Sequence, residues 1–250
     1  SNSQQQLPKN AAWQQAYNTP SIIPVYDDRR DDAVFPKKYT SPEQVGLTNN
    51  FNNPVATANY YDNRNETYQV LTNFYAQLNL IPDKLNIRSS YSYDYSMIRG
   101  SEFTPTYYVG TNQKKEVTEL TKKNTNYYKY IWDNVATYTD KWGKHSFTGM
   151  LGASMRQEQY RLLEGTATNV PEGEDVWKYI ALGNKEGATV KDDGWEYRGL
   201  SYFTRLNYNY NDKYMLMFTF RADGSSKYND KWGYFPSIGA AWVISQEPFM

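Results

Sequence analysis

Two runs of alternating side chains joined by a short polar turn constrain the fold more than any other feature of the chain. Apolar and aromatic residues occupy every second position of residues 205–210, and again of residues 214–221 after the turn at 211–213. A period of two, with one apolar and one more polar face, is typical of a long antiparallel hairpin. Tyrosine and phenylalanine dominate the apolar face, as in barrels whose outer surface meets lipid. The pattern therefore predicts a piece of a membrane-barrel wall.

The same alternation recurs along the chain and predicts about seven long antiparallel strands. Their approximate ranges are 68–80, 85–97, 125–138, 147–156, 205–210, 214–221 and 234–245. Short turns join the first strand to the second, the third to the fourth and the fifth to the sixth. Longer loops, near 98–124, 159–197 and 224–233, make the other connections. Short turns at one rim and long loops at the other are typical of bacterial outer-membrane barrels, whose long loops are extracellular.

Strand length and strand number add to this prediction. Strands of about ten to fourteen residues, tilted by roughly 45°, span about 23–33 Å, which matches an apolar band of about 25 Å. We therefore predict an all-β fold, an antiparallel section of a large transmembrane β-barrel spanning residues 66–250. Seven is an odd number, and an unclosed sheet leaves unpaired backbone groups in lipid, so we expect the chain to be a fragment. Residues 1–65 contain many prolines and are predicted to form a long, irregular extracellular region.

Composition excludes several classes of function. Lys and Arg total 27 and so do Asp and Glu, so charge gives no indication of a nucleic-acid partner. Cysteine is absent and His145 is the only histidine, which argues against zinc sites and disulfide frameworks. There is neither a run of 18 apolar residues nor a signal peptide at the start. A mean hydropathy of −0.84 beside 17% aromatic residues suits a barrel, because half of each strand and all its loops can be polar.

Two alternative functions stay open at this stage. A soluble all-β carbohydrate-binding module could use the same aromatic residues as a stacking platform, but long strands and one-sided loops argue against it. A secreted glycan-cleaving enzyme would need two carboxylates converging about 5–10 Å apart. His145 has no evident nucleophile or carboxylate partner near it in sequence, so we expect no catalysis and no cofactor.

Three segments resemble one transporter family. Residues 205–214 (RLNYNYNDKY), 220–228 (FRADGSSKY) and 232–250 (WGYFPSIGAAWVISQEPFM) together resemble the SusC/RagA family of TonB-dependent outer-membrane transporters of Bacteroidota. Weaker similarities lie at 53–56 and 143–152. The resemblance implies a plugged barrel of about 22 strands that imports nutrients across the bacterial outer membrane. It also implies a SusD-like surface lipoprotein as partner, TonB contacting a segment absent from these residues, and an oligosaccharide or oligopeptide as cargo.

Exposed aromatic residues of the predicted loops are the best candidates for contact with cargo or with the partner lipoprotein, because sugars and peptides both stack on rings. These candidates are Trp13, Tyr17, Tyr107, Tyr108, Trp177, Tyr179, Trp195, Tyr228 and Trp232. The alternative is that each packs within its own loop or belongs to the aromatic girdle at the membrane interface.

A second set consists of arginines on the polar faces of the predicted strands, where they would line the lumen or contact a plug; the alternative is that they only hydrate the barrel wall. These are Arg88, Arg156, Arg205 and Arg221. The acidic residues within 27–32 could ligate calcium, but the two arginines between them favour a self-neutralised loop. Residues 223–226 (DGSS) are interpreted as a structural turn. No metal site is predicted.

Overall fold

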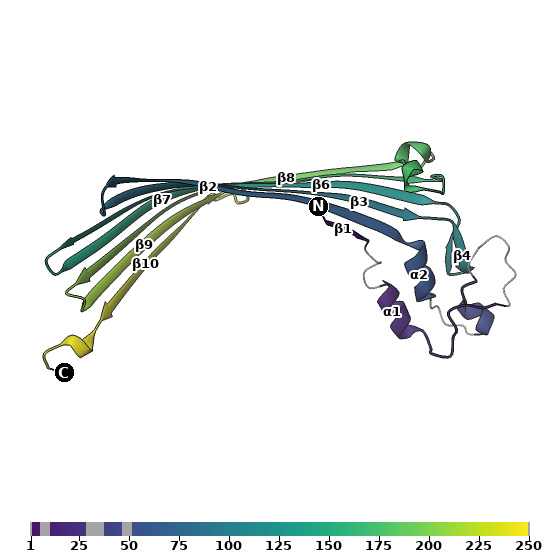
Figure 1. Cartoon of the computed structure of the whole chain (residues 1–250), viewed down its shortest axis with the longest axis horizontal. Coiled ribbons are helices and arrows are strands. Elements are labelled where there is room, and N and C mark those ends of the chain that lie inside the picture. The colour runs from purple at the N-terminus through teal and green to yellow at the C-terminus, as the bar shows by residue number, and fades with distance from the viewer. Residues whose placement is uncertain (1, 6–10, 29–37, 47–51, 250) are drawn as a thin grey trace. The chain divides into compact units, whose positions relative to one another are not determined.

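The computed structural model describes residues 2–5, 11–28, 38–46 and 52–249. Its seven long strands are β2 (Asp62–Ile81), β3 (Leu85–Thr104), β6 (Glu119–Trp142), β7 (His145–Thr168), β8 (Thr189–Tyr210), β9 (Tyr214–Ser225) and β10 (Trp232–Trp242). They follow one another in chain order across one sheet, with the short strand β1 (Asn2–Gln5) paired to β2 at its edge. Figure 1 shows these strands running alongside one another. The prediction of an antiparallel section of about seven long strands is confirmed.

Positive φ angles at the short turns explain why the strands reverse where the sequence predicts. Asp83 has a φ of 59° between β2 and β3, and Gly143 has a φ of 59° between β6 and β7. Asn211 and Asp212, with φ of 51° and 56°, make the turn between β8 and β9. Gly, Asn and Asp adopt this region at less cost than other residues, so these positions favour tight hairpins.

The strands are longer than the sequence pattern predicts. Strands β6 and β7 each contain 24 residues and β8 contains 22, so much of the predicted loops 98–124 and 159–197 is strand. The pattern fails in segments such as 119–124 and 161–168, because polar residues occupy both faces there and no apolar stripe marks the alternation. The loop predicted near 224–233 is shorter, since β9 ends at Ser225 and β10 begins at Trp232.

The chain divides into two compact units, and both contain segments of the long strands. Unit 1 comprises residues 1–68, 97–125 and 161–193, and unit 2 comprises residues 69–96, 126–160 and 194–250.

Unit 1 contains helices where the sequence predicts only irregular structure. Helix α1 spans Ala11–Asn18 and α2 spans Pro54–Tyr60, with the 3₁₀ turn η1 at Pro42–Val45. Pro54 lies in the first turn of α2, and the side chain of Asn53 caps the helix. The combination of Asn and Pro was therefore a start signal, although α2 is too short to show a clear helical period.

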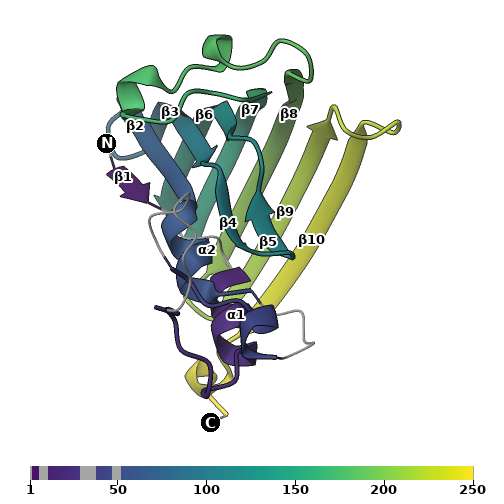
Figure 2. The same cartoon turned by 90° about the vertical axis from the view of Figure 1, so that its right-hand side faces the viewer.

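The strands β4 (Tyr107–Gly110) and β5 (Gln113–Lys115) form a hairpin that packs against the α2 region of unit 1 (Figure 2). Tyr39, Ala56 and Val109 form the buried apolar cluster there. The amide of Asn53 donates a hydrogen bond to Gln113 Oε1 at 2.7 Å, and Gln113 Nε2 donates back to the Asn53 carbonyl at 3.0 Å. Reciprocal buried bonds of this kind fix the helix and the hairpin together.

A second apolar cluster in unit 1 lies beneath the connection between β7 and β8. Phe103, Leu120, Ala167 and Val170 are its buried members, and Ile180 packs against them. Ile180 belongs to the 3₁₀ turn η3 (Ile180–Leu182), which follows η2 (Asp175–Trp177). We call residues 169–188, which join the two strands, the folded loop. Burial of these apolar side chains holds it against the strands.

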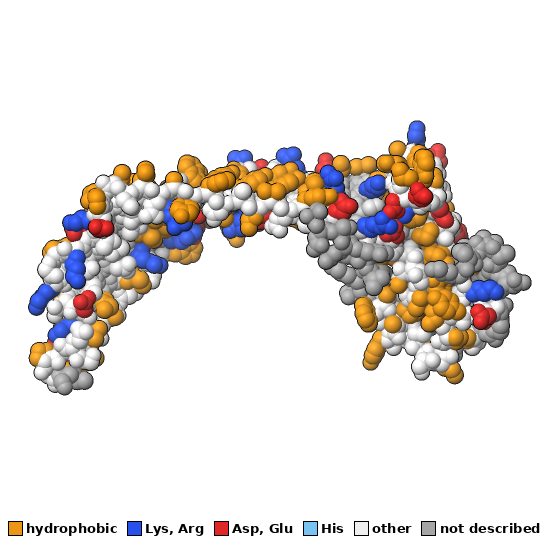
Figure 3. Space-filling model, in the orientation of Figure 1, with side chains coloured by type: hydrophobic (Ala, Val, Ile, Leu, Met, Phe, Trp, Pro, Cys, Tyr) orange, Lys and Arg blue, Asp and Glu red, His pale blue; other side chains and the backbone are white. Residues whose placement is uncertain are grey.

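Unit 2 consists mainly of strands, and their apolar faces stay exposed. Tyr91 and Phe218 have solvent-exposed rings, and Ala222 is the one buried hydrophobic residue among the described residues of this unit. A soluble two-layered module would bury such rings in a core. The space-filling view shows hydrophobic side chains along the strand surface (Figure 3). Within the described part of the chain, no helix combines the length and apolar character needed to cross a membrane.

Candidate functional site

Three aromatic rings from adjacent strands form a ladder on one face of unit 2. Tyr127 of β6 lies 5.0 Å from Tyr160 of β7, and Tyr160 lies 6.1 Å from Trp195 of β8, measured between ring centroids. Tyr127 is 41% exposed and Trp195 is 46% exposed, so the ladder is accessible to a ligand. We call these three residues the aromatic ladder. Paired strands hold its rings at fixed spacing, which lowers the entropic cost of binding.

Basic groups border the aromatic ladder. The ammonium of Lys227, in the connection between β9 and β10, lies 5.4 Å from the Trp195 ring and 5.0 Å from the Tyr197 ring. The guanidinium of Arg156 lies 5.8 Å from the ring of Tyr197. Arg156 also pairs with Glu158, two residues further along β7. These contacts place cations over ring faces, where the ring quadrupole attracts them.

A hollow of about 640 Å³ continues from Arg156 and Tyr197 along the same face. Arg221 Nε donates to the Asp223 carboxylate at 2.7 and 2.8 Å, and its guanidinium also donates to Ser201 at 3.2 Å. In the strand register Arg221 lies opposite Phe203 of β8 and opposite Phe235 of β10. The face therefore combines charges of both signs with ring surfaces, and it resembles a binding surface more than a reaction centre.

The residues of this site were partly anticipated. Trp195, Arg156, Arg221, Tyr228 and Trp232 were predicted as contact or lumen residues, and all but Trp195 line the hollow. Tyr228 is strongly exposed in the connection between β9 and β10.

Trp232, however, stacks on Tyr202 at 6.1 Å, on the apolar face of the hairpin. The small residue Gly224 lies between them and permits that approach, because a Cβ there would meet the Trp232 ring at 3.2 Å. This position suits the girdle interpretation of Trp232.

Four residues of this site are not predicted from the sequence: Tyr127, Tyr160, Tyr197 and Lys227. The alternation of faces could have placed Tyr127. Tyr128 and Tyr130 belong to the apolar face of their strand, so Tyr127 must point to the polar face. The pairing of Tyr127 with Tyr160 depends on strand register, which single strands do not reveal.

The two tyrosines predicted on the loop before β6 belong to the β4–β5 hairpin of unit 1. Tyr107 stacks face to face on Tyr60 at 4.5 Å, which makes it part of the packing of its own region. Burial raises the pKa of the Tyr107 hydroxyl. Tyr108 lies one residue further along β4, opposite Lys114.

The other aromatic candidates of unit 1 are exposed. Trp13 and Tyr17 project from α1, and Trp177 and Tyr179 belong to the folded loop. The ammonium of Lys122 lies 5.0 Å from the Tyr179 ring.

The remaining two arginines lie on strands of unit 2. Arg88 places its guanidinium 4.5 Å from the ring of Tyr75, and Arg205 is exposed opposite Thr219. Neither belongs to the hollow described above.

The calcium candidate lies mostly outside the described residues, since only Asp27 and Asp28 of the acidic segment are described. Among described residues, no group of three or more His, Asp or Glu side chains could hold a metal ion. His145 Nδ1 lies 2.6 Å from the Tyr208 hydroxyl, and its ring stacks on Trp142 at 5.7 Å. Aromatic packing beside the β6–β7 turn accounts for this histidine.

Comparisons with known proteins found TonB-dependent receptors. No family model matches the chain. TonB-dependent receptor P26 of Formosa agariphila is 30% identical over 210 residues, which cover 80% of this chain and 20% of that protein. TonB-dependent receptor P3 of the same organism is 29% identical over 213 residues, or 82% of this chain and 20% of that protein. TonB-dependent receptor SusC of Bacteroides thetaiotaomicron is 45% identical over 53 residues, covering 20% of this chain and 5% of SusC.

A solved structure shares the fold. The structure of the RagAB peptide transporter matches with a TM-score of 0.70 at 19% identity, over 79% of this chain and 22% of that chain. The chain spans about a fifth of the length of the first two receptors. These relatives are receptors and transporters, in agreement with the expectation that this chain is not an enzyme.

Proposed function

The chain belongs to the SusC/RagA family of TonB-dependent receptors, and on this premise we propose that it forms part of the barrel wall of an outer-membrane nutrient importer. Its exposed rings on one face of unit 2, such as Tyr91 and Phe218, would meet lipid. Its polar face, which carries Arg156 and Arg221, would line the lumen. An inward polar face beside an outward apolar face is the arrangement that a wide transmembrane barrel requires.

The cargo that fits the polar face best is an oligosaccharide, and the aromatic ladder is the observation that carries this proposal. Sugar rings present apolar C–H faces that stack on exposed aromatic rings, and three rings about 5–6 Å apart offer a continuous track. Arg221 and Asp223 beside the track offer hydrogen-bond donors and acceptors for hydroxyl groups. A SusD-like lipoprotein would deliver the cargo, and TonB would act on another part of the importer.

An oligopeptide is the second candidate cargo. The solved structure with the same fold is titled a peptide transporter, and the hollow contains both signs of charge, as a peptide's ends would require. The exposed ladder favours a glycan, because its rings are neutral and arranged in a row.

The test uses the intact importer that contains this segment, purified with its lipoprotein partner. Binding of a pool of labelled oligosaccharides and of a pool of oligopeptides is measured for the native protein and for Trp195→Ala. We expect oligosaccharide affinity to fall about 10-fold, or roughly 1.4 kcal/mol, because one stacking ring is removed.

The matched control is Trp132→Ala, because Trp132 is 44% exposed and contacts Ser89 rather than the ladder. Equal losses in the two variants would contradict a specific role for the ladder. If the native protein binds oligopeptides and not oligosaccharides, the oligosaccharide proposal is wrong and the oligopeptide proposal takes its place.

A further inference from the structure

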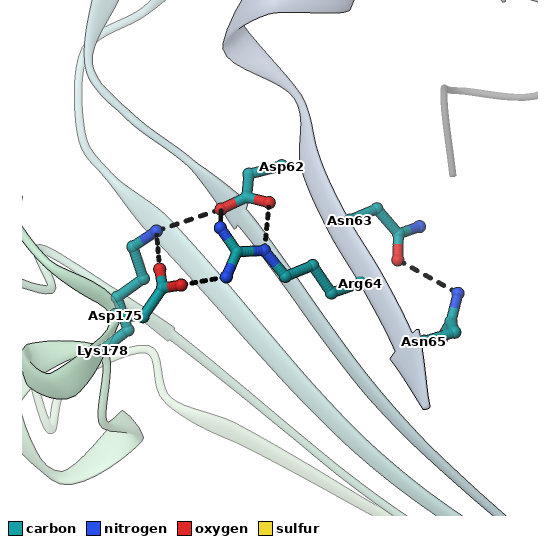
Figure 4. A network of polar contacts seen from close by, with 6 residues as sticks. All are labelled: Asp62, Asn63, Arg64, Asn65, Asp175 and Lys178. Carbon is teal, nitrogen blue, oxygen red and sulfur yellow. Dashed lines mark hydrogen bonds and ion pairs between the residues drawn. The ribbon is translucent and has the colours of Figure 1, made fainter. Parts of the chain in front are cut away.

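A second hollow, in unit 1, contains charges that the cargo site does not use. Its volume is about 680 Å³, and strands β2, β3, β6, β7 and β8 line it together with the folded loop. Asp62, Arg64 and Glu66 of β2 project into it from alternate positions. Figure 4 shows Asp62 and Arg64 on one side of β2, and Asn63 and Asn65 on the other. The hollow therefore lies on one defined face of the strands.

Four charged side chains fix the folded loop as a wall of this hollow. Lys178 Nζ lies 2.8 Å from Asp175 and 3.1 Å from Asp62. Arg64 pairs with both of these carboxylates, at 3.1 Å to Asp62 and in closer contact with Asp175 (Figure 4). We call these four residues the charge clasp. The Lys178 side chain is 11% exposed, and its ammonium also lies 4.5 Å from the Phe103 ring.

Two further cations in the hollow have aromatic neighbours but no carboxylate partner. The Arg99 guanidinium lies 5.7 Å from the Tyr68 ring, and the Lys122 ammonium lies 5.0 Å from the Tyr179 ring. Both side chains line the hollow, and among described residues neither forms an ion pair. An aromatic ring attracts a cation without cancelling its charge. Both groups stay available to an anionic ligand.

Exposed apolar side chains adjoin these cations. Leu163 is 55% exposed and Val190 is 76% exposed, and both line the hollow. The alternate positions of β2 that begin with Arg64 continue as Glu66, Tyr68 and Val70, and after Thr72 as Phe74 and Ala76. A strand face that changes from charged through Tyr to apolar is typical of the boundary between lipid headgroups and hydrocarbon.

We propose that this hollow binds the phosphate-bearing headgroup of an outer-leaflet glycolipid, with Arg99 and Lys122 contacting the phosphate. Leu163 and Val190 lie beside the lipid's apolar part. The exposed apolar neighbours favour a lipid over free phosphate, because a small anion makes no use of them. This inference rests on the proposed placement in the outer membrane, and the lipid site is separate from the cargo site.

The experiment uses the intact importer extracted from outer membranes in mild detergent. Native mass spectrometry measures how many phosphate-bearing glycolipid molecules stay bound to each protein molecule. The native protein is compared with the double variant Arg99→Gln and Lys122→Gln. We expect retention to fall roughly 30-fold, from the loss of two cations at an anionic lipid surface. The control, Arg88→Gln combined with Lys185→Gln, removes the same charges from a part of β3 outside the hollow and from an exposed position of the folded loop, and we expect it to retain the lipid.

Separate arms distinguish the possible failures. Outer-membrane fractionation comes first, since absence of the native importer from that fraction would overturn the proposed function itself. If the importer is present there but the two double variants retain equal lipid, the headgroup site is refuted. Equal retention of dephosphorylated glycolipid also refutes it. Displacement of the lipid by millimolar inorganic phosphate would assign the site to free phosphate instead.

Discussion

Replacing Lys178 by methionine tests whether the charge clasp holds the folded loop against unit 1. Lys178 donates to Asp175 at 2.8 Å and to Asp62 at 3.1 Å, and its side chain is mostly buried. Methionine keeps the length and the contact with Phe103 but removes the charge. The change therefore isolates the ionic contribution from the apolar one.

The expected magnitude follows from the exposure of each partner. A hydrogen bond to a charged group contributes about 1.5–3 kcal/mol when buried, whereas an exposed ion pair contributes about 0.2–1 kcal/mol. Asp175 is about half exposed and Asp62 is about a quarter exposed, so both bonds lie toward the lower end. Arg64 still pairs with both carboxylates in the variant. We expect the free energy of local opening to fall by about 2 kcal/mol, which corresponds to roughly 30-fold faster amide exchange where the exchange rate follows the opening equilibrium.

Hydrogen–deuterium exchange of the intact protein that contains this chain measures this effect at the amides of the folded loop. The control is Lys185→Met, an exposed lysine of the same loop outside the clasp. Exchange faster in Lys178→Met alone would support the reasoning. Equal exchange in the two variants would refute it, because the apolar cluster beneath the loop would then be sufficient.

Three further predictions follow from unit 1. Lys178 lowers the pKa of the Asp175 carboxyl in the folded protein. The stability that the charge clasp contributes is therefore complete above the unfolded Asp pKa of about 3.9 and is lost as pH falls through the lower folded pKa. Amide exchange of the folded loop, corrected for intrinsic rates, should accelerate only below about pH 4. Asn53→Ala removes the side-chain cap of α2 and the two bonds that Asn53 Nδ2 donates to the carbonyls of Val25 and Thr40, and should lower the free energy of unfolding of the region by about 2–4 kcal/mol in calorimetry. Gly183→Ala should increase proteolysis of the folded loop, because a Cβ would lie 2.8 Å from the Thr168 carbonyl oxygen.

The sequence was informative where one side of a strand differs in polarity from the other. The hairpin at 205–221 shows that contrast and was predicted with its turn. Segments 119–124 and 161–168 do not show it, so they were predicted as loop although they belong to 24-residue strands. Propensity alone is a weak guide to strands, because packing decides them.

The candidate site was less predictable, because its contacts join distant residues. Trp195 was predicted as a contact residue, but its neighbour Tyr160 becomes apparent only from the pairing of β7 with β8. Lys178 and Asp62 are 116 residues apart, and no local pattern connects them. Sequence periodicity reports the face on which a side chain lies, whereas register decides which side chain it meets.

The strict alternation of faces also matters for evolvability and for engineering. In β8 and β9, Arg221 and its register partner Phe203 lie on one face, and their immediate neighbours in sequence lie on the other. In the proposed barrel, a substitution at either position would alter the lumen-facing surface and leave the lipid-facing surface unchanged. Residues 203–221 therefore suit mutant libraries in which alternate residues are varied to change specificity. The residues between them are kept, so that folding and membrane insertion do not change.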